Sequence, residues 1–353
     1  MTEKEFTKKI KEVNRAQKKR QEARFLNLQS MNGNTWAIFR VIVGSRMTGK
    51  SYAVTERMCK LRKRFGNNVK CYWMRIADTS TKQLLCNNAR NLVDPDLVRK
   101  YNIDLKTKGN VVYNHGKEFC EVYPLASFGK LKGQAFYDKD FKGKYLIVLD
   151  EFQLEQGEKR TSFDILYNFI GMLENIARTS KNNVEVWLLG NTLEEASTIL
   201  KAFNFLPERF GRFYLKSKRC IIDNLEPTEE YLKDRKGSMA DILGGDAMSN
   251  YTNELTKDRK LIDKSRCKHP TTIIMFDKDK NWYTLWDGKI VKKYNNEKLP
   301  DESCIAMRPY LAVPFNKEKK MAVIQMYDAQ VFRFNNLITQ SYFTGELQKI
   351  RKQ

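Results

Sequence analysis

Eight consecutive residues, GSRMTGKS at positions 44–51, have the types and spacing of a phosphate-binding loop. Gly44 and Gly49 allow backbone conformations in which amide N–H groups face a phosphate, and a helix starting near Lys50 directs its positive end there. The Lys50 ammonium would contact the β- and γ-phosphates, and the Ser51 hydroxyl would ligate Mg²⁺. The motif therefore predicts binding and hydrolysis of ATP. The loop residues between the two glycines are Ser45, Arg46, Met47 and Thr48.

Two adjacent acids follow a second apolar run, YLIVLDEF at 145–152. In a parallel sheet, the carboxyl ends of the strands form the site, so a carboxylate there can hold Mg²⁺. Asp150 is the expected Mg²⁺ group, and Glu151 is expected to orient or deprotonate the attacking water. Two solvated acids at a strand end are the alternative, which the loop at 44–51 makes less favourable.

Two further polar residues could complete such a site. Asn191 follows the apolar run VEVWLLG, and it would sense the γ-phosphate if that strand neighbours the Asp150 strand; a turn residue is the alternative. Arg178 follows an amphipathic segment. It could reach a neighbouring subunit's ATP as an arginine finger, or it could simply complement the helix dipole. Spacing alone leaves both interpretations of Arg178 open.

The basic segment Gly129–Gly133 (GKLKG) precedes the Asp150 strand. Lys130 and Lys132 could grip a phosphate backbone or touch a neighbouring site. Spacing alone slightly favours an exposed loop with solvated lysines.

The composition favours a polyanionic partner. The 353 residues include 64 Lys+Arg against 42 Asp+Glu, for a formal net charge of +22. A merely solvated basic surface is the alternative. Apolar runs reach only about five residues, far short of the roughly 20 that a membrane span needs, so we expect no membrane association. The opening residues lack the apolar core of a signal peptide.

The seven scattered cysteines form no CxxC pair, which favours reduced thiols in a cytosolic compartment over a disulfide frame. Cys267 and His269 are too close together and too isolated to predict a metal site.

The elements that must position these residues alternate between strands and helices. Strands are expected at 36–43, 69–76, 145–149 and 184–189, with a hairpin at 111–124. Helices are expected at 51–65, 81–92 and 163–176. This alternation predicts an α/β fold with a mostly parallel sheet and helices on both faces. We expect a basic N-terminal arm (1–35), a P-loop ATPase domain (36–215), a linker region (216–267) and a smaller α+β domain (268–353).

The order of four segments resembles the DNA-packaging ATPases of phi-29-like small tailed phages. These segments are GSRMTGKS, YLIVLDEF, ENIARTSKNNVEVWLLGNT and PERFGRFY, and the similarity covers about residues 36–215. The resemblance implies an additional-strand P-loop ATPase domain, a linker and a C-terminal domain like a degenerate RNase H nuclease. It also implies a homomeric, pentameric ring that pumps double-stranded DNA into a procapsid. The ring would act at the portal vertex in the host-cell cytoplasm, with structural RNA as a further partner.

The resemblance also bears on individual residues. Arg178 stands where the family carries its trans-acting arginine finger, and Lys132 falls near a lysine that acts across the subunit interface. Gln29 matches an adenine-contacting glutamine only weakly. A working RNase H-type nuclease needs clustered carboxylates for two metals. The C-terminal domain offers Asp277, Asp279 and Asp287, which we interpret as turn residues, so we expect no nuclease activity.

The sequence therefore predicts an ATP-driven translocase of double-stranded DNA. Two alternatives stay open. One is another P-loop motor, namely a helicase or a terminase with an active nuclease, which would unwind or cut DNA. The other is a nucleotide-regulated DNA-binding assembly protein, whose ATP turnover duplex DNA would not stimulate.

Overall fold

The computed structural model describes residues 29–128, 140–153, 164–178, 183–191, 198–243, 261–276, 282–293, 311–312 and 317–351. The chain divides into a larger unit, Met1–Phe203 with Arg209–Thr256, and a smaller unit, Asn204–Glu208 with Lys257–Gln353. Residues 1–28 of the expected basic arm, the loop with Lys130 and Lys132, and the carboxylates Asp277 and Asp279 lie outside the described residues.

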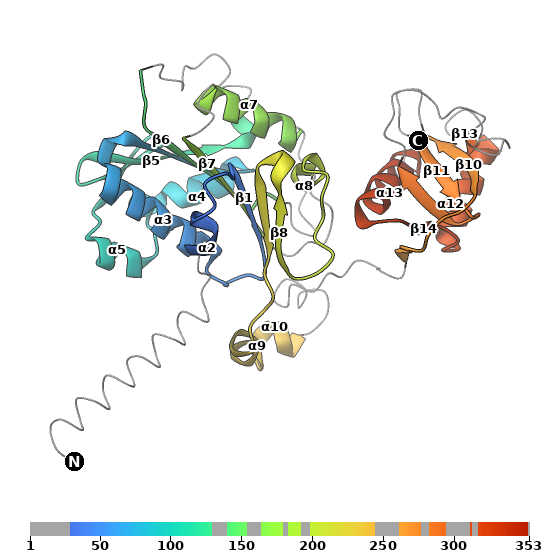
Figure 1. The fold of residues 1–353 in the computed structure, drawn as a ribbon. Helices are drawn as coiled ribbons and strands as arrows, with labels where there is room; N and C mark the ends of the chain where they lie inside the picture. Colours follow the sequence, from blue (N-terminus) through green and yellow to red (C-terminus); the bar gives the residue numbers. More distant parts are fainter. Residues whose placement is uncertain are drawn as a thin grey trace. The chain divides into compact units, whose positions relative to one another are not determined.

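The larger unit is built on one mixed sheet flanked by helices (Figure 1). Its strands are β1 (Phe39–Val43), β2 (Val69–Arg75), β3 (Leu105–Lys108), β4 (Val111–Asn114), β5 (Lys117–Pro124), β6 (Lys144–Asp150), β7 (Val184–Gly190), β8 (Gly211–Leu215) and β9 (Cys220–Asn224). Its helices are α2 (Gln29–Asn32), α3 (Lys50–Phe65), α4 (Asp78–Ala89), α5 (Pro95–Tyr101), α7 (Ile165–Ala177), α8 (Thr198–Ala202), α9 (Glu229–Arg235) and α10 (Met239–Leu243).

The strand order in this sheet is β3-β4-β5-β2-β6-β7-β1-β9-β8. The central strands from β5 to β9 run parallel, whereas β3, β4 and β5 pair antiparallel at one edge and β8 pairs antiparallel with β9 at the other. The mostly parallel sheet expected from the sequence is therefore confirmed. The antiparallel β3-β4-β5 edge extends it beyond the single hairpin that the sequence predicted.

Both faces of the sheet are covered. In β6, the neighbouring residues Tyr145 and Leu146 point to opposite faces, yet each is at most 1% exposed. A parallel strand buried on both sides reads as a continuous apolar run, which is why YLIVL could be assigned from sequence. In α7, Phe169 and Ile176 are buried as the helical spacing predicted, whereas Ile170 is 49% exposed.

The large sheet continues beyond the boundary expected at residue 215. β9 (220–224) pairs in parallel with β1 over its whole length, so the first part of the expected linker 216–267 is a buried strand of the sheet. The short run CIIDN was missed because it lies in a polar, charged neighbourhood and is only five residues long.

The smaller unit contains a separate five-stranded sheet of order β13-β10-β11-β12-β14. β10, β11 and β12 form an antiparallel meander, and the two-residue strands β13 and β14 add in parallel at its edges. This confirms an α+β C-terminal domain. Its elements are β10 (Pro270–Met275), β11 (Trp282–Trp286), β12 (Ile290–Lys293), β13 (Leu311–Ala312), β14 (Arg333–Phe334), α12 (Lys317–Asp328) and α13 (Leu337–Arg351).

Phe343 of α13 is the centre of the small core. Its ring, which is fully buried, lies 5.0–5.4 Å from the ring centroids of Phe276, Tyr283, Phe332 and Phe334, in edge-on or tilted arrangements. One helix residue thus joins α13 to β11, to β14 and to the residue that follows β10.

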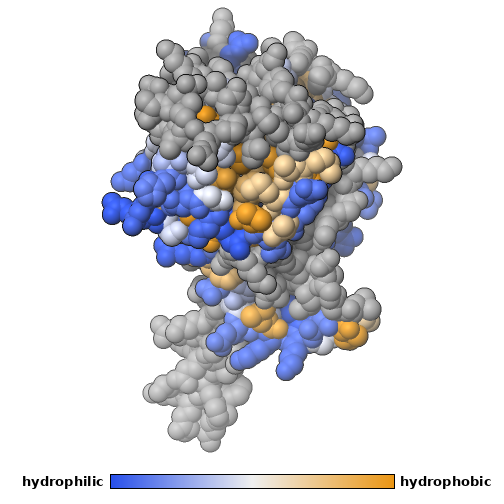
Figure 2. All heavy atoms as spheres, turned by 90° about the vertical axis from the view of Figure 1, so that its right-hand side faces the viewer, coloured by the Kyte–Doolittle hydropathy of each residue, from blue (hydrophilic) through white to orange (hydrophobic). Residues whose placement is uncertain are grey.

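Most thiols of the described residues are buried, and the described surface is mixed in character. Among the described residues, no helix combines the length and apolar character needed to cross a membrane. Hydrophilic side chains border the apolar ones visible on the face in Figure 2. The thiols of Cys59, Cys71, Cys120 and Cys220 are buried in the large unit, and burial raises the pKa of each, whereas Cys86 of α4 is exposed.

Replacing Phe343 with alanine should destabilise the small unit by about 3–5 kcal/mol, because truncating a buried aromatic ring leaves a cavity among its partners. Hydrogen exchange measured peptide by peptide should show faster exchange in β10–β12 and unchanged exchange in β6 and β7. Val331→Ala, at a 43% exposed position of the same unit, is the control and should change little. Unaltered exchange in β10–β12 would refute this role for Phe343.

Candidate functional site

The loop between β1 and α3 uses its two glycines for different reasons. Gly49 has φ of +82° and directly precedes α3, a left-handed conformation that glycine adopts without strain. Gly44 instead has little space, since a Cβ placed there would lie 2.9 Å from the Leu225 side chain. Met47 at the apex also has a positive φ, +62°. Alternation of right- and left-handed residues gathers successive amides into an anion-binding concavity.

Lys50 is buried at the base of this loop. Its Nζ donates hydrogen bonds to the carbonyl oxygens of Gly44 (2.8 Å) and Ser45 (2.7 Å), and the residue is only 8% exposed. Burial lowers the pKa of Lys50 to about 8, although the nearby Asp150 and Glu151 act in the opposite direction. The ammonium is thus held next to the loop, where a bound phosphate would raise the pKa of Lys50 and keep the side chain charged.

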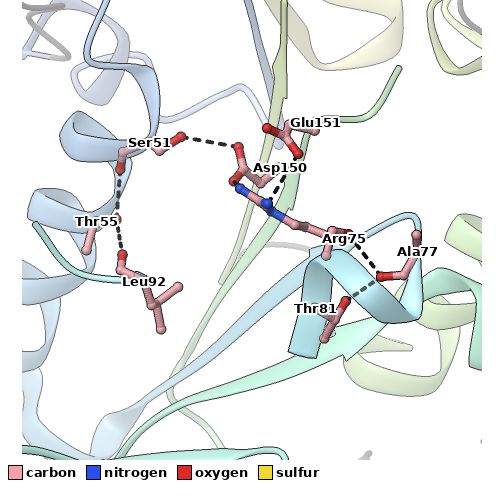
Figure 3. Close-up of polar contacts among 9 residues, drawn as sticks. Ser51, Thr55, Arg75, Ala77, Thr81, Leu92, Asp150 and Glu151 are labelled. Carbon is pink, nitrogen blue, oxygen red and sulfur yellow. Dashed lines mark hydrogen bonds and ion pairs between the residues drawn. The ribbon is translucent and has the colours of Figure 1, made fainter. Parts of the chain in front are cut away.

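Ser51 and Asp150 come together from elements 99 residues apart in the chain. The Ser51 hydroxyl lies 3.2 Å from Oδ1 of Asp150 and donates to it, as Figure 3 shows. The two oxygens that the sequence assigned to Mg²⁺ are therefore adjacent. Asp150 is 3% exposed, so its carboxylate needs partners within the protein.

Arg75, at the end of β2, supplies the main partner. Its Nη2 and Nε donate to Oδ2 of Asp150 at 2.9 and 3.3 Å, and its Nη1 lies 3.3 Å from Oε2 of Glu151 (Figure 3). One guanidinium thus bridges both acids. Arginine suits this role because its planar fork carries several donors.

Glu151 lies in a turn, and its side chain extends toward solvent. Its φ is +56°, and its side chain is 47% exposed. The next residue, Phe152, is buried, and its amide donates to the Leu189 carbonyl (3.1 Å). The chain is therefore anchored just after Glu151, which leaves the carboxylate at the mouth of the site. Left-handed non-glycine residues of this kind cluster at functional sites.

β7 lies between the two halves of the site and places Asn191. β7 pairs in parallel with both β6 and β1, with Asp150 opposite Leu189 and Val43 opposite Gly190. The strand thus neighbours the Asp150 strand, as the sensor interpretation of Asn191 required. Gly190 also permits close approach, since a Cβ there would lie 2.7 Å from the Phe152 ring.

The structure also describes three other predicted residues. Arg178 is exposed at the C-terminal end of α7 with φ of +32°. Gln29 begins α2, and the Met31 carbonyl of this helix accepts a hydrogen bond from Arg40 near the start of β1, whereas the loop follows the end of β1. Asp287 accepts hydrogen bonds from the amides of Lys268 and His269, which lower its pKa and make it a turn carboxylate.

The residues present fit a nucleotide's phosphates and a magnesium ion. The Ser45 hydroxyl oxygen is buried, and among the described residues it has no hydrogen-bond partner. Lys50 and the amide concavity offer donors to an anion, and the adjacent Ser51 and Asp150 oxygens are the hard ligands that Mg²⁺ prefers.

Sequence reasoning missed Arg75. The only sequence feature that marked Arg75 was its position at the end of the run VKCYWM. An arginine at the end of a strand is commonly just exposed to solvent. Its role depends on the pairing of β2 with β6, in which Met74 lies opposite Leu149. That pairing brings the next residues, Arg75 and Asp150, to the same edge.

Comparisons with known proteins identify the fold. The chain matches no protein-family model and no curated protein. It is similar to the structure of the phi-28 gp11 DNA packaging motor, with a TM-score of 0.63 and 16% identity over 92% of this chain and 98% of that one. It is also similar to the bacteriophage phi-29 viral genome packaging motor assembly, with a TM-score of 0.65 and 18% identity over 93% and 100%. The mixed α/β fold with a mostly parallel sheet and a separate small C-terminal domain is confirmed.

Replacing Arg75 with glutamine should lower the free energy of unfolding by about 1–3 kcal/mol, because the buried Asp150 carboxylate loses its main cation. Urea denaturation without nucleotide measures this. Arg99→Gln is a matched control, since Arg99 pairs with Asp96 on the surface, where the side chains are 73% and 68% exposed. That change should stay within about 0.5 kcal/mol. Equal effects of the two substitutions would show that the Arg75 bridge is not stabilising.

Proposed function

We propose that this protein is an ATP-driven motor that moves double-stranded DNA into a phage procapsid, working as a homomeric ring. The observation that carries the proposal is the convergence of Lys50, Ser51, Asp150 and Glu151 at one edge of the large sheet. The fold shared with two phage packaging motors supports the choice of DNA packaging among P-loop functions.

The site residues have distinct roles in this proposal. Amides of Gly44–Lys50 and the Lys50 ammonium hold the β- and γ-phosphates of ATP. Ser51 and Asp150 would hold Mg²⁺, which when bound neutralises charge on the phosphate oxygens. Glu151 orients the attacking water and accepts its proton from the mouth of the site.

Lys50 must exchange partners for this to happen. In the structure it donates to the carbonyls of Gly44 and Ser45, so a phosphate oxygen competes with these neutral acceptors. A charge-assisted hydrogen bond is the stronger of the two. We propose further that Asn191 senses the γ-phosphate from the end of β7 and that Arg178, exposed after α7, acts on the ATP of a neighbouring subunit.

The partners follow from charge and from the resemblance. A net charge of +22 suits binding to the phosphate backbone of duplex DNA, which a motor indifferent to sequence requires. We propose a ring, pentameric as in the family, at the portal vertex of the procapsid in the host-cell cytoplasm, with structural RNA as a further partner. Lys130 and Lys132 stay candidates for contact with DNA or with a neighbouring subunit, and Gln29 for the adenine.

The central test is ATP hydrolysis with and without duplex DNA. Wild-type protein should hydrolyse ATP faster with duplex DNA, and Lys50→Ala should abolish ATP binding. Glu151→Gln should still bind ATP but lose about 10²–10⁴ in turnover, the usual contribution of a positioned base.

Glu118→Gln is the matched control, because the Glu118 side chain is 44% exposed and also pairs with an arginine, Arg62. It should hydrolyse ATP normally. Turnover indifferent to DNA would favour the nucleotide-regulated assembly protein. Strand separation or DNA cleavage in the same preparation would favour a helicase or a terminase.

ATP binding should take up a proton at alkaline pH, because a bound phosphate raises the pKa of Lys50 from about 8. In the free protein, about a tenth of Lys50 is neutral at pH 7 and about nine tenths at pH 9. Affinity should therefore fall as pH rises above 8.

Titration calorimetry in buffers of different ionisation enthalpy measures the proton uptake. It should be small at pH 7 and close to one proton at pH 9. Equal uptake at both values would mean that Lys50 is not the titrating group.

The unfolding equilibrium should respond to Lys50 with the opposite sign. Its folded pKa lies below the unfolded value of 10.5, so the unfolded chain binds more protons between pH 8 and 10.5. The cost of burying the charge is present below pH 8 and is relieved as the pH rises through that window.

A further inference from the structure

The segment that follows β9 contacts the loop between β1 and α3 at two places. Leu225 packs against Gly44, and its amide donates to the Val43 carbonyl at 2.8 Å. Six residues later, Tyr231 of α9 reaches the apex of the loop. The chemistry proposed above does not use these contacts.

Tyr231 is fixed in place from both sides. α9 begins after Thr228, whose hydroxyl oxygen accepts the Tyr231 amide at 3.2 Å. The Tyr231 side chain is 3% exposed, and its hydroxyl donates to the Arg46 carbonyl at 2.8 Å. The Arg235 guanidinium lies 5.4 Å from the centre of the Tyr231 ring and also contacts the Met47 sulfur. Two residues of α9 therefore hold the peptide at the loop apex.

Because a peptide unit is planar, the contact with the Arg46 carbonyl also fixes the direction of the Met47 N–H. In a trans peptide, the C=O of one residue and the N–H of the next point in opposite directions. The Arg46 carbonyl accepts from Tyr231 of α9, so the Met47 N–H points away from α9. The positive φ of Met47 then continues the amide concavity toward Gly49.

We propose that Tyr231 is a positioning residue for phosphate binding, which holds the Arg46–Met47 peptide so that the Met47 amide faces the phosphates. This inference rests on the proposed function. Coupling of this kind is reciprocal, so phosphate in the loop stabilises α9 to the same extent that α9 favours phosphate. α9 thereby responds to the occupancy of the loop.

Tyr231→Phe tests the hydrogen bond while keeping the ring in the core. Loss of one hydrogen bond should raise the Kd for ADP about three- to tenfold, measured by titration calorimetry with Mg²⁺. Tyr101→Phe is the matched control, because the Tyr101 hydroxyl contacts Glu56 at 3.4 Å and not the loop. It should leave the Kd for ADP unchanged.

A second readout separates positioning from simple packing. In wild-type protein, ADP should slow hydrogen exchange of the α9 amides at Leu232–Arg235, and Tyr231→Phe should lose most of that protection. Arg235→Met, which removes the contact with Met47 from a half-buried position, should weaken ADP binding about twofold. This variant keeps the test decisive if Tyr231→Phe folds poorly.

The possible outcomes distinguish this inference from the proposed function. If wild-type protein binds no ADP, both are overturned. If wild-type protein binds ADP, and Tyr231→Phe and Arg235→Met bind it equally well with α9 still protected, the positioning role alone is overturned. Weaker binding together with lost protection of α9 supports it.

Discussion

The insertion of β7 between β1 and β6 is the constraint on which the site depends. Parallel strands lie about 4.8 Å apart, so the ends of β1 and β6 are separated by roughly 10 Å across the sheet. That separation leaves the space in which we propose that the terminal phosphates of ATP and a metal ion bind. β7 also sets the register of β1 and β6 relative to each other, because Val43 and Asp150 lie opposite its last two residues, Gly190 and Leu189. A slip of one residue would point the Asp150 side chain to the other face of the sheet.

The buried charged groups of this site contact other groups of the protein in place of the ligands that we propose they bind. Lys50 donates to two backbone carbonyls, and Arg75 bridges Asp150 and Glu151. An unpaired charge at these depths would be costly, so these contacts let the site fold without a ligand. They are also contacts that a phosphate and a cation can replace with stronger ones. The positive φ values of Met47 and Glu151 fit the same pattern, since local strain gathers where function demands a particular backbone.

The sequence predicted the parts of the site that depend on local pattern. The glycine loop, the acid pair and the central strands follow from spacing, because a buried parallel strand is continuously apolar. Arg75 and Tyr231 could not be found in this way. Each acts on a residue far along the chain, Asp150 and Arg46, and only the strand order and the path after β9 bring them there. β9 itself escaped notice because CIIDN is short and surrounded by polar residues. The roles of Arg178, Asn191, Lys132 and Gln29 stay predictions.

The placement of the cysteines decides how the protein can be labelled. A thiol reacts with maleimides as the thiolate, and burial both hides the sulfur and raises its pKa, as at Cys59, Cys71 and Cys120. Cys86 is exposed on α4, the helix that begins three residues after Arg75. A fluorophore attached there would report on the helix that follows Arg75 in the chain without disturbing the core of the sheet.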